Sequence, residues 1–308
     1  MRRLLFTRRF ESYTGGHGKV LDYMGHADAH AGWAAQVGLD PGSSMVGNPF
    51  LEHPRARIGI PVAAQDDVLF LAGEDWRLMP PDGPARVVIN LIQGIRHADP
   101  GSSLRSHLSR KAIRICVSHA VANAIRTTGD VLGPVHVVPA ALSLPAAAPA
   151  PPPVREGIFI AAHKQPRLGT ELAAALEALG HRVDLQLGLV ERDVFLSKLA
   201  RAEVAIPLPL VNEGFFLPGL EAMALGCLLI GVDALGNREY LRDGVNAIVA
   251  PATVAGIMAA VSHVPADRQA RDAMVAAGMA TAASFSMARE REAFHRLLDD
   301  LEAQWDAT

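Results

Sequence analysis

Two glutamates stand in an apolar stretch, NEGFFLPGLEAMALG at 212–226, with seven residues between Glu213 and Glu221. A carboxylate in apolar surroundings is costly unless it is paired or hydrogen-bonded. The preceding run VAIPLPL at 204–210 predicts a buried strand, so Glu213 falls in the loop at its carboxyl end. Pro218 suits the first turn of a following helix, where its missing N–H is no loss, and Glu221 then lies within about the first turn.

This arrangement suits a ligand that carries both hydroxyl groups and phosphate. The free N–H groups and the dipole at a helix start attract anions, and Gly214 lets the backbone approach a ligand closely. Carboxylates accept hydrogen bonds from hydroxyl groups. A sugar nucleotide carries all of these groups, whereas Glu221 taken alone is equally well explained as a helix N-terminal acid.

The elements that must position these residues are apolar runs alternating with helical stretches. Strands buried on both faces and separated by helices are typical of parallel sheets covered on both sides. The strand-like runs are RLLFT (3–7), DDVLFLA (66–72), ARVVINLIQG (85–94), AIRICVS (112–118), PVHVVPA (134–140), GIFIAA (157–162), RVDLQLG (182–188), CLLIGVD (227–233) and AIVAP (247–251). The helical stretches are 19–37, 102–112, 119–129, 170–180, 193–202 and the amphipathic 286–305.

A Pro/Ala-rich segment at 141–155 interrupts this alternation and predicts a semi-rigid linker. The predicted organisation is therefore α/β, with two doubly wound Rossmann-like domains, at 1–140 and 156–288, and a cleft between them. The helix at 289–308 is expected to pack back on the first domain. Ligands of such sheets bind outside the carboxyl ends of the strands.

Composition narrows the class of protein. A formal net charge of −3 does not suggest a nucleic-acid partner. Cys116 and Cys227 lie in apolar runs and are expected to be buried thiols in a reducing compartment. The start MRRLLFTRRF lacks the apolar core of a signal peptide, and no apolar run reaches the ~20 residues that span a bilayer. We expect a cytoplasmic protein, with peripheral membrane association left open.

The sequence from EGFFLPGLEAMALG through CLLIGVDALGNREYLRDGVNAIVAP resembles the donor-site signature of family 4 glycosyltransferases, which are retaining enzymes of the GT-B fold. That signature reads Glu-Gly-Phe-Gly-Leu-Pro, a second Glu after seven residues, and Ala-Met-Ala-x-Gly. It closes with a Gly-x-x-Glu turn and an Asp-Gly-x-Asn-Gly-like segment. The residues in those closing places are Gly236, Glu239, Asp243, Gly244 and Asn246.

The resemblance implies roles for the opening residues. Glu213 would bind hydroxyls of the transferred sugar, and Glu221 the ribose hydroxyls. The amides from Phe215 to Leu217 would contact the sugar or the diphosphate. Phe216 replaces the family's second glycine, so a ring is expected in space normally left for the pyranose.

Cations should neutralise the diphosphate, because the leaving group gains negative charge as the glycosidic bond breaks. The family places an Arg and a Lys four residues apart after the first strand of its second domain. Here AAHKQPRLGTEL offers Lys164 and Arg167 in reversed order and at shorter spacing, with His163 beside them. Ordinary loop charges are the alternative.

In the first domain, the turn TGGHG matches the family's Gly-Gly loop through Gly15 and Gly16, and His17 and Lys19 could add positive charge. A plain tight turn is the alternative. Many relatives have His-Gly at the strand end where this chain has Gln93 before a glycine. Gln93 can bind a sugar hydroxyl but cannot carry a proton, so either His97 supplies the titrating group or none is needed.

The implied activity is metal-independent, retaining transfer from a nucleoside diphosphate sugar to an acceptor hydroxyl, with no separate cofactor. The acceptor could be a glycan, a lipid-linked glycan or a small molecule. Two alternatives remain open: a catalytically weak nucleotide-sugar-binding protein or partner subunit, and a GT-B epimerase or phosphorylase-like enzyme.

Overall fold

The computed structural model describes residues 1–60, 64, 66–79, 87–145, 148–149, 152 and 154–307. The chain forms two compact units. Unit 1 comprises Met1–Ala140 and Met287–Thr308, and unit 2 comprises Ala141–Ser286. The segment 141–155 lies at the start of unit 2, where Leu142 N–H donates to Phe285 O at 2.8 Å. Within it, 146–147, 150–151 and 153 fall outside the described residues.

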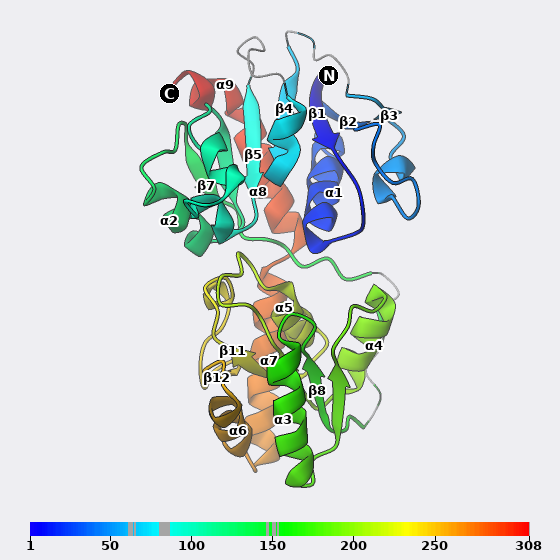
Figure 1. Cartoon of the computed structure of the whole chain (residues 1–308), viewed down its shortest axis with the longest axis vertical. Coiled ribbons are helices and arrows are strands. Elements are labelled where there is room, and N and C mark those ends of the chain that lie inside the picture. Colours follow the sequence, from blue (N-terminus) through cyan, green and yellow to red (C-terminus); the bar gives the residue numbers. More distant parts are fainter. Residues whose placement is uncertain are drawn as a thin grey trace. The chain divides into compact units, whose positions relative to one another are not determined.

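Unit 1 is built on a seven-stranded parallel sheet of order β3-β2-β1-β4-β5-β6-β7 (Figure 1). Its strands are β1 (Arg2–Arg8), β2 (Trp33–Leu39), β3 (Ala56–Ile58), β4 (Val68–Ala72), β5 (Val88–Ile92), β6 (Ile113–Cys116) and β7 (Val135–Val137). Its helices are α1 (Gly15–Asp28), α2 (His119–Arg126), α8 (Met287–Asp299) and α9 (Leu301–Asp306), with 3-10 helices η1 (Pro49–Glu52), η2 (Gly73–Leu78), η3 (Ile95–Ala98) and η4 (Ser103–His107).

Two predictions in this unit are wrong in part. The stretch 19–37 is not one helix, because α1 ends at Asp28 and β2 begins at Trp33. Trp33, Ala35 and Val37 are buried at alternate positions while β2 pairs with β1, so sheet pairing overrides the helical composition. The helix predicted at 102–112 is only the short η4.

The C-terminal helix α8 runs beside α1 within unit 1 (Figure 1). Buried Glu290 on α8 accepts from Lys19 Nζ at 3.1 Å and lies 2.9 Å from His26 Nε2. Tyr23 and Phe294 pack edge to face, with ring centroids 4.9 Å apart. Lys19 is therefore buried in an ion pair, which corrects the expectation that it adds charge to the glycine turn.

Unit 2 contains a five-stranded parallel sheet of order β12-β11-β10-β8-β9. Its strands are β8 (Ile158–Ala161), β9 (Val183–Gln186), β10 (Val204–Pro207), β11 (Leu228–Val232) and β12 (Ile248–Ala250). Its helices are α3 (Pro166–Ala178), α4 (Arg192–Arg201), α5 (Leu217–Ala224), α6 (Val254–Ser262) and α7 (Arg268–Ser284), with a 3-10 turn η5 (Asn237–Glu239).

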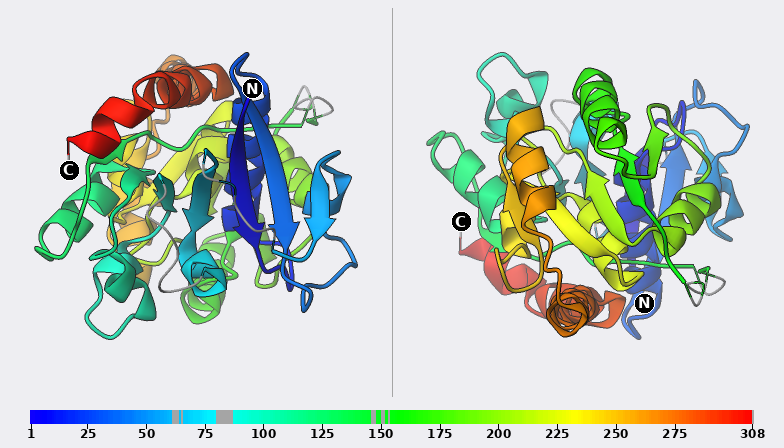
Figure 2. Two further views of the ribbon diagram at one scale, coloured as in Figure 1. Left: turned by 90° about the horizontal axis from the view of Figure 1, so that it is seen from above. Right: turned by 90° about the horizontal axis from the view of Figure 1, so that it is seen from below.

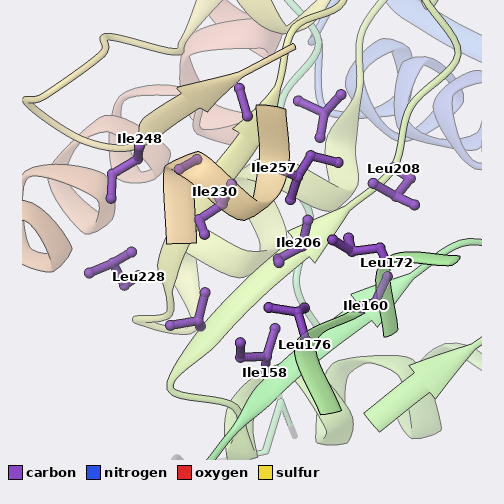
Figure 3. Packing of buried hydrophobic residues seen from close by; sticks show 14 of the residues in the cluster. Ile158, Ile160, Leu172, Leu176, Ile206, Leu208, Leu228, Ile230, Ile248 and Ile257 are labelled. Carbon is purple, nitrogen blue, oxygen red and sulfur yellow. The ribbon is translucent and has the colours of Figure 1, made fainter. Parts of the chain in front are cut away.

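Alternate residues of each strand face different helices in unit 2. Ile158 and Ile160 pack in a cluster with Leu172 of α3 and Ile257 of α6, as Figure 3 shows. Phe159, between them in sequence, packs in the opposite cluster, which includes Leu196 of α4 and Leu220 of α5. Helices therefore lie on both sides of the strands, as the right view of Figure 2 shows, and both faces of β8, β10 and β11 are buried as the apolar runs predict.

Among the described residues, no helix is both long and apolar enough to cross a bilayer.

Candidate functional site

The candidate site of unit 2 lies at the edge where its parallel strands end. The loops that leave the carboxyl ends of β8, β10 and β11 are 162–165, 208–216 and 233–236. α4 begins shortly after β9 ends at the same edge. Because all the strands run in one direction, these four connections share one rim of the sheet.

Glu213 and Lys164 form an ion pair across two of these loops. Lys164 Nζ lies 2.5 Å from Glu213 Oε1, and the N–H of Leu210 donates to the same oxygen at 3.2 Å. The ammonium group also lies 5.5 Å from the centroid of the Phe216 ring. The carboxylate is partly buried and the lysine more exposed, so a ligand at the rim meets the cation and the carboxylate together.

Glu221 is buried in the second turn of α5 and pairs with Arg192, the first residue of α4. Arg192 Nη1 lies 2.7 Å from Glu221 Oε1. At this distance the two groups form an ion pair. Among the described residues, however, no donor is oriented to form a hydrogen bond with Glu221 Oε1. Burial raises the pKa of Glu221, and Arg192 opposes the rise.

Arg192 is not among the site residues predicted from the sequence. The available signal was its position, four residues past the predicted strand at 182–188 and therefore at the rim where the other loops converge. The pairing of Arg192 with Glu221 could not be predicted from the sequence, because it depends on how α4 packs beside α5.

A buried tyrosine fixes the entry to α5. The hydroxyl of Tyr240 donates to Phe216 O at 2.6 Å, and the Tyr240 ring packs 5.8 Å from that of Phe215. Burial, together with Glu221 and Glu213, raises the pKa of Tyr240, so both carboxylates act on the same phenol. Gly219 is required here, because a Cβ would lie 2.2 Å from the hydroxyl oxygen.

The residues that match the closing part of the family signature hold the surrounding turns. Asn246 accepts from Arg242 N–H and donates to Tyr240 O, both at 2.8 Å. Asp243 accepts from Val249 N–H at 2.9 Å. A Cβ at Gly236 would lie 2.6 Å from Glu213 O, so this glycine lets the 233–236 loop pack on the backbone that carries Glu213.

The other residues predicted for the donor site differ in placement. Gly214 is buried, Leu217 is the first residue of α5, and the Phe216 ring is buried beside Lys164. His163 is half-buried, and burial together with Lys164 lowers its pKa. Arg167 is 92% exposed and pairs with Glu171 one turn along α3, at 2.8 Å. The structure therefore does not bring Arg167 to the Lys164–Glu213 pair.

In unit 1, four predicted residues lie together where α1 begins. Gly15 and Gly16 open the helix, and Gln93 Nε2 donates to Gly16 O at 3.1 Å. His17 Nδ1 lies 2.9 Å from Thr14 Oγ1. Burial and the nearby Arg8 lower the pKa of His17 to about 4.

His97 is buried in η3. Burial, reinforced by Arg96 and Arg114, lowers its pKa to about 3. Its imidazole is therefore neutral at physiological pH and is a poor proton donor.

Comparison with known proteins agrees with this architecture. Residues 157–267 match the family described as Glycosyl transferases group 1. Sucrose-phosphate synthase from Thermosynechococcus elongatus superposes with a TM-score of 0.70 at 14% identity, covering 98% of this chain and 100% of that one. HepE from Anabaena in complex with UDP-glucose gives 0.68 at 15% identity, covering 97% and 100%.

The lipopolysaccharide outer core galactosyltransferase WaaB, in its apo form, gives a TM-score of 0.65 at 13% identity, covering 97% of this chain and 99% of that one. No curated protein matches the sequence. The expected fold class is thus confirmed: the chain has the fold of the GT-B glycosyltransferases, and its residues 157–267 match the glycosyl transferase group 1 family.

Proposed function

We propose that this glycosyltransferase moves a sugar from a nucleoside diphosphate sugar to an acceptor hydroxyl, with retention of configuration and without a bound metal ion. The observation that carries the proposal is the pairing of Glu213 with Lys164 at the loop that enters α5. A carboxylate that accepts sugar hydroxyls and an ammonium group that attracts phosphate lie together at this point of the rim.

The chemistry follows from these groups. Glu213 accepts from hydroxyls of the transferred sugar and Glu221 from the ribose. Lys164 and the amides at the start of α5 stabilise the negative charge that grows on the leaving diphosphate. In front-face attack the leaving phosphate takes the acceptor's proton, so no protein base is needed, which fits the lowered pKa that makes His97 a weak base.

The donor class follows by analogy. HepE, with the same fold, is described in complexes with UDP, with UDP and glucose, and with UDP-glucose. We therefore propose UDP-glucose as the first donor to test, with GDP-, dTDP- and ADP-glucose as comparators.

The test is a transfer assay that follows release of the nucleoside diphosphate with a panel of acceptor glycans, while NMR reads the anomeric configuration of the product. We expect a retained α-linkage, activity that survives EDTA, and about a hundredfold or greater loss in Glu213→Gln. Inversion of the anomeric centre, or full activity in the folded variant, would contradict the proposal.

A second candidate function is nucleotide-sugar binding without transfer. It is favoured by one observation: both acids are already neutralised by internal cations, Glu213 by Lys164 and Glu221 by Arg192. Nucleotide binding without product across the acceptor panel would support this alternative.

A further inference from the structure

Two contacts hold Arg192 at the rim. Its Nη1 lies 2.7 Å from Glu221 Oε1, and its Nη2 donates to Ser143 O at 2.8 Å. These two contacts hold the guanidinium group beside the buried carboxylate. The side chain is still 45% exposed, and among the described residues nothing accepts from its Nε–H. Donors therefore remain for a ligand.

Arg167 is placed quite differently. It and Glu171 are 92% and 51% exposed, and they form a helix-surface pair of the kind that is worth little and reorients freely. Among the described residues, no buried group holds the Arg167 guanidinium at the rim.

The charges of the rim show why a second cation is needed. Glu213 lies in the loop that enters α5 and Glu221 lies on α5, and both act on the phenol of Tyr240. Two carboxylates with Lys164 alone leave one uncompensated negative charge, which would repel a diphosphate. Arg192 cancels that charge, and its planar fork suits phosphate oxygens.

We propose that Arg192, and not Arg167, is the second cation that binds the phosphates of the donor. The inference rests on the proposed function, because it assumes that the rim binds a nucleoside diphosphate. In this arrangement one side of the guanidinium stays on Glu221 while Nε–H and the remaining N–H groups reach phosphate oxygens. Arg192 thereby joins the groups that hold ribose and phosphate.

The experiment is calorimetric titration of UDP, and separately of pyrophosphate, into the full chain. Pyrophosphate carries the phosphates without the ribose, so it reports the cation alone. The variants are Arg192→Gln, Arg192→Lys and Arg167→Gln. The control is Arg268→Gln, because Arg268 also begins a helix, is 87% exposed and pairs at i,i+4 with Asp272.

We expect Arg192→Gln to weaken both ligands by about tenfold or more. Arg192→Lys should recover part of the loss, because the charge remains but the fork is lost. Arg167→Gln should have less than a third of that effect, and Arg268→Gln should match wild type. A thermal melt checks that each variant is folded.

Glu221→Gln separates the two roles of Arg192. If the arginine binds phosphate directly, this variant keeps or improves pyrophosphate binding. Pyrophosphate affinity that falls with Glu221→Gln as far as with Arg192→Gln would overturn the inference, because Arg192 would then only support Glu221. Equal affinities of Arg192→Gln and wild type for both ligands would also overturn the inference. In that case, UDP binding by wild type would leave the proposed function standing. Wild type that binds neither ligand would refute both.

Discussion

The contact between Tyr240 and Gly219 gives a quantitative prediction about the entry to α5. In Tyr240→Phe a buried hydroxyl is lost, with its 2.6 Å hydrogen bond to Phe216 O, and we expect a loss of about 1–2 kcal/mol in the free energy of unfolding. In Gly219→Ala the new Cβ would sit 2.2 Å from that hydroxyl. Overpacking of this kind lowers the free energy of unfolding by about 1–3 kcal/mol. The higher helix propensity of alanine offsets up to about 1 kcal/mol of that loss.

The double variant should be less destabilised than the sum of the two. Without the hydroxyl, the nearest atom to the Cβ introduced by Gly219→Ala is ring Cζ at 3.1 Å, a contact that small ring movement relieves. We expect a favourable coupling of about 1 kcal/mol or more in the double-mutant cycle.

Urea unfolding followed by far-UV circular dichroism measures these free energies, and hydrogen exchange of peptides over 215–225 localises the effect. Trp33, Trp76 and Trp305 all belong to unit 1, so tryptophan fluorescence reports that unit separately. Additive effects within about 0.5 kcal/mol would refute the proposed contact. Equal shifts in the tryptophan transition would show that the effect does not arise in unit 2.

Three further predictions concern buried titratable side chains. Because the pKa of Glu221 is raised, the folded protein keeps the carboxyl proton to higher pH than the unfolded chain, so its stability falls as pH rises above the usual glutamate pKa. The urea midpoint should therefore fall less between about pH 4 and 8 in Glu221→Gln than in wild type. The same dependence of the midpoint on pH in both proteins would contradict the account. The pKa of His97 is lowered to about 3 from 6.5, so the contribution of the neutral imidazole to stability is full above pH 6.5 and is lost as pH falls toward 3. In His97→Gln, the stability of unit 1 measured by tryptophan fluorescence should therefore depend less on pH over that range. Glu290→Ala removes the shared acceptor of Lys19 and His26 and should destabilise unit 1 by about 3 kcal/mol, whereas the exposed control Glu292→Ala should change it by less than about 0.5 kcal/mol.

The sheets were largely predictable because both of their faces are buried. Every run predicted as a strand in unit 2 overlaps an observed strand, since β8, β10, β11 and β12 carry apolar residues toward helices on either side and the edge strand β9 does so on one side. β3 escaped prediction because it is a three-residue strand at the sheet edge with partly exposed side chains. β2 escaped because its alanines also favour a helix.

The local parts of the site were predictable and the long-range parts were not. Pro218 and the preceding strand correctly predict Glu213 in a loop and Glu221 on a helix. The partners of these acids come from α4 and from the loop after β8, and only the order of strands in the sheet brings them near. The burial of His97 likewise depends on packing that its neighbours in sequence do not disclose.

The most direct measurement is calorimetric titration of UDP-glucose into wild type, Glu213→Gln and Glu221→Gln, with Glu171→Gln as an exposed control on α3. We predict that wild type and Glu171→Gln bind equally, and that each of the other two variants binds about tenfold or more weakly while keeping its melting temperature within a few degrees. Unchanged affinity in both folded variants would contradict the claim that these two carboxylates bind the donor.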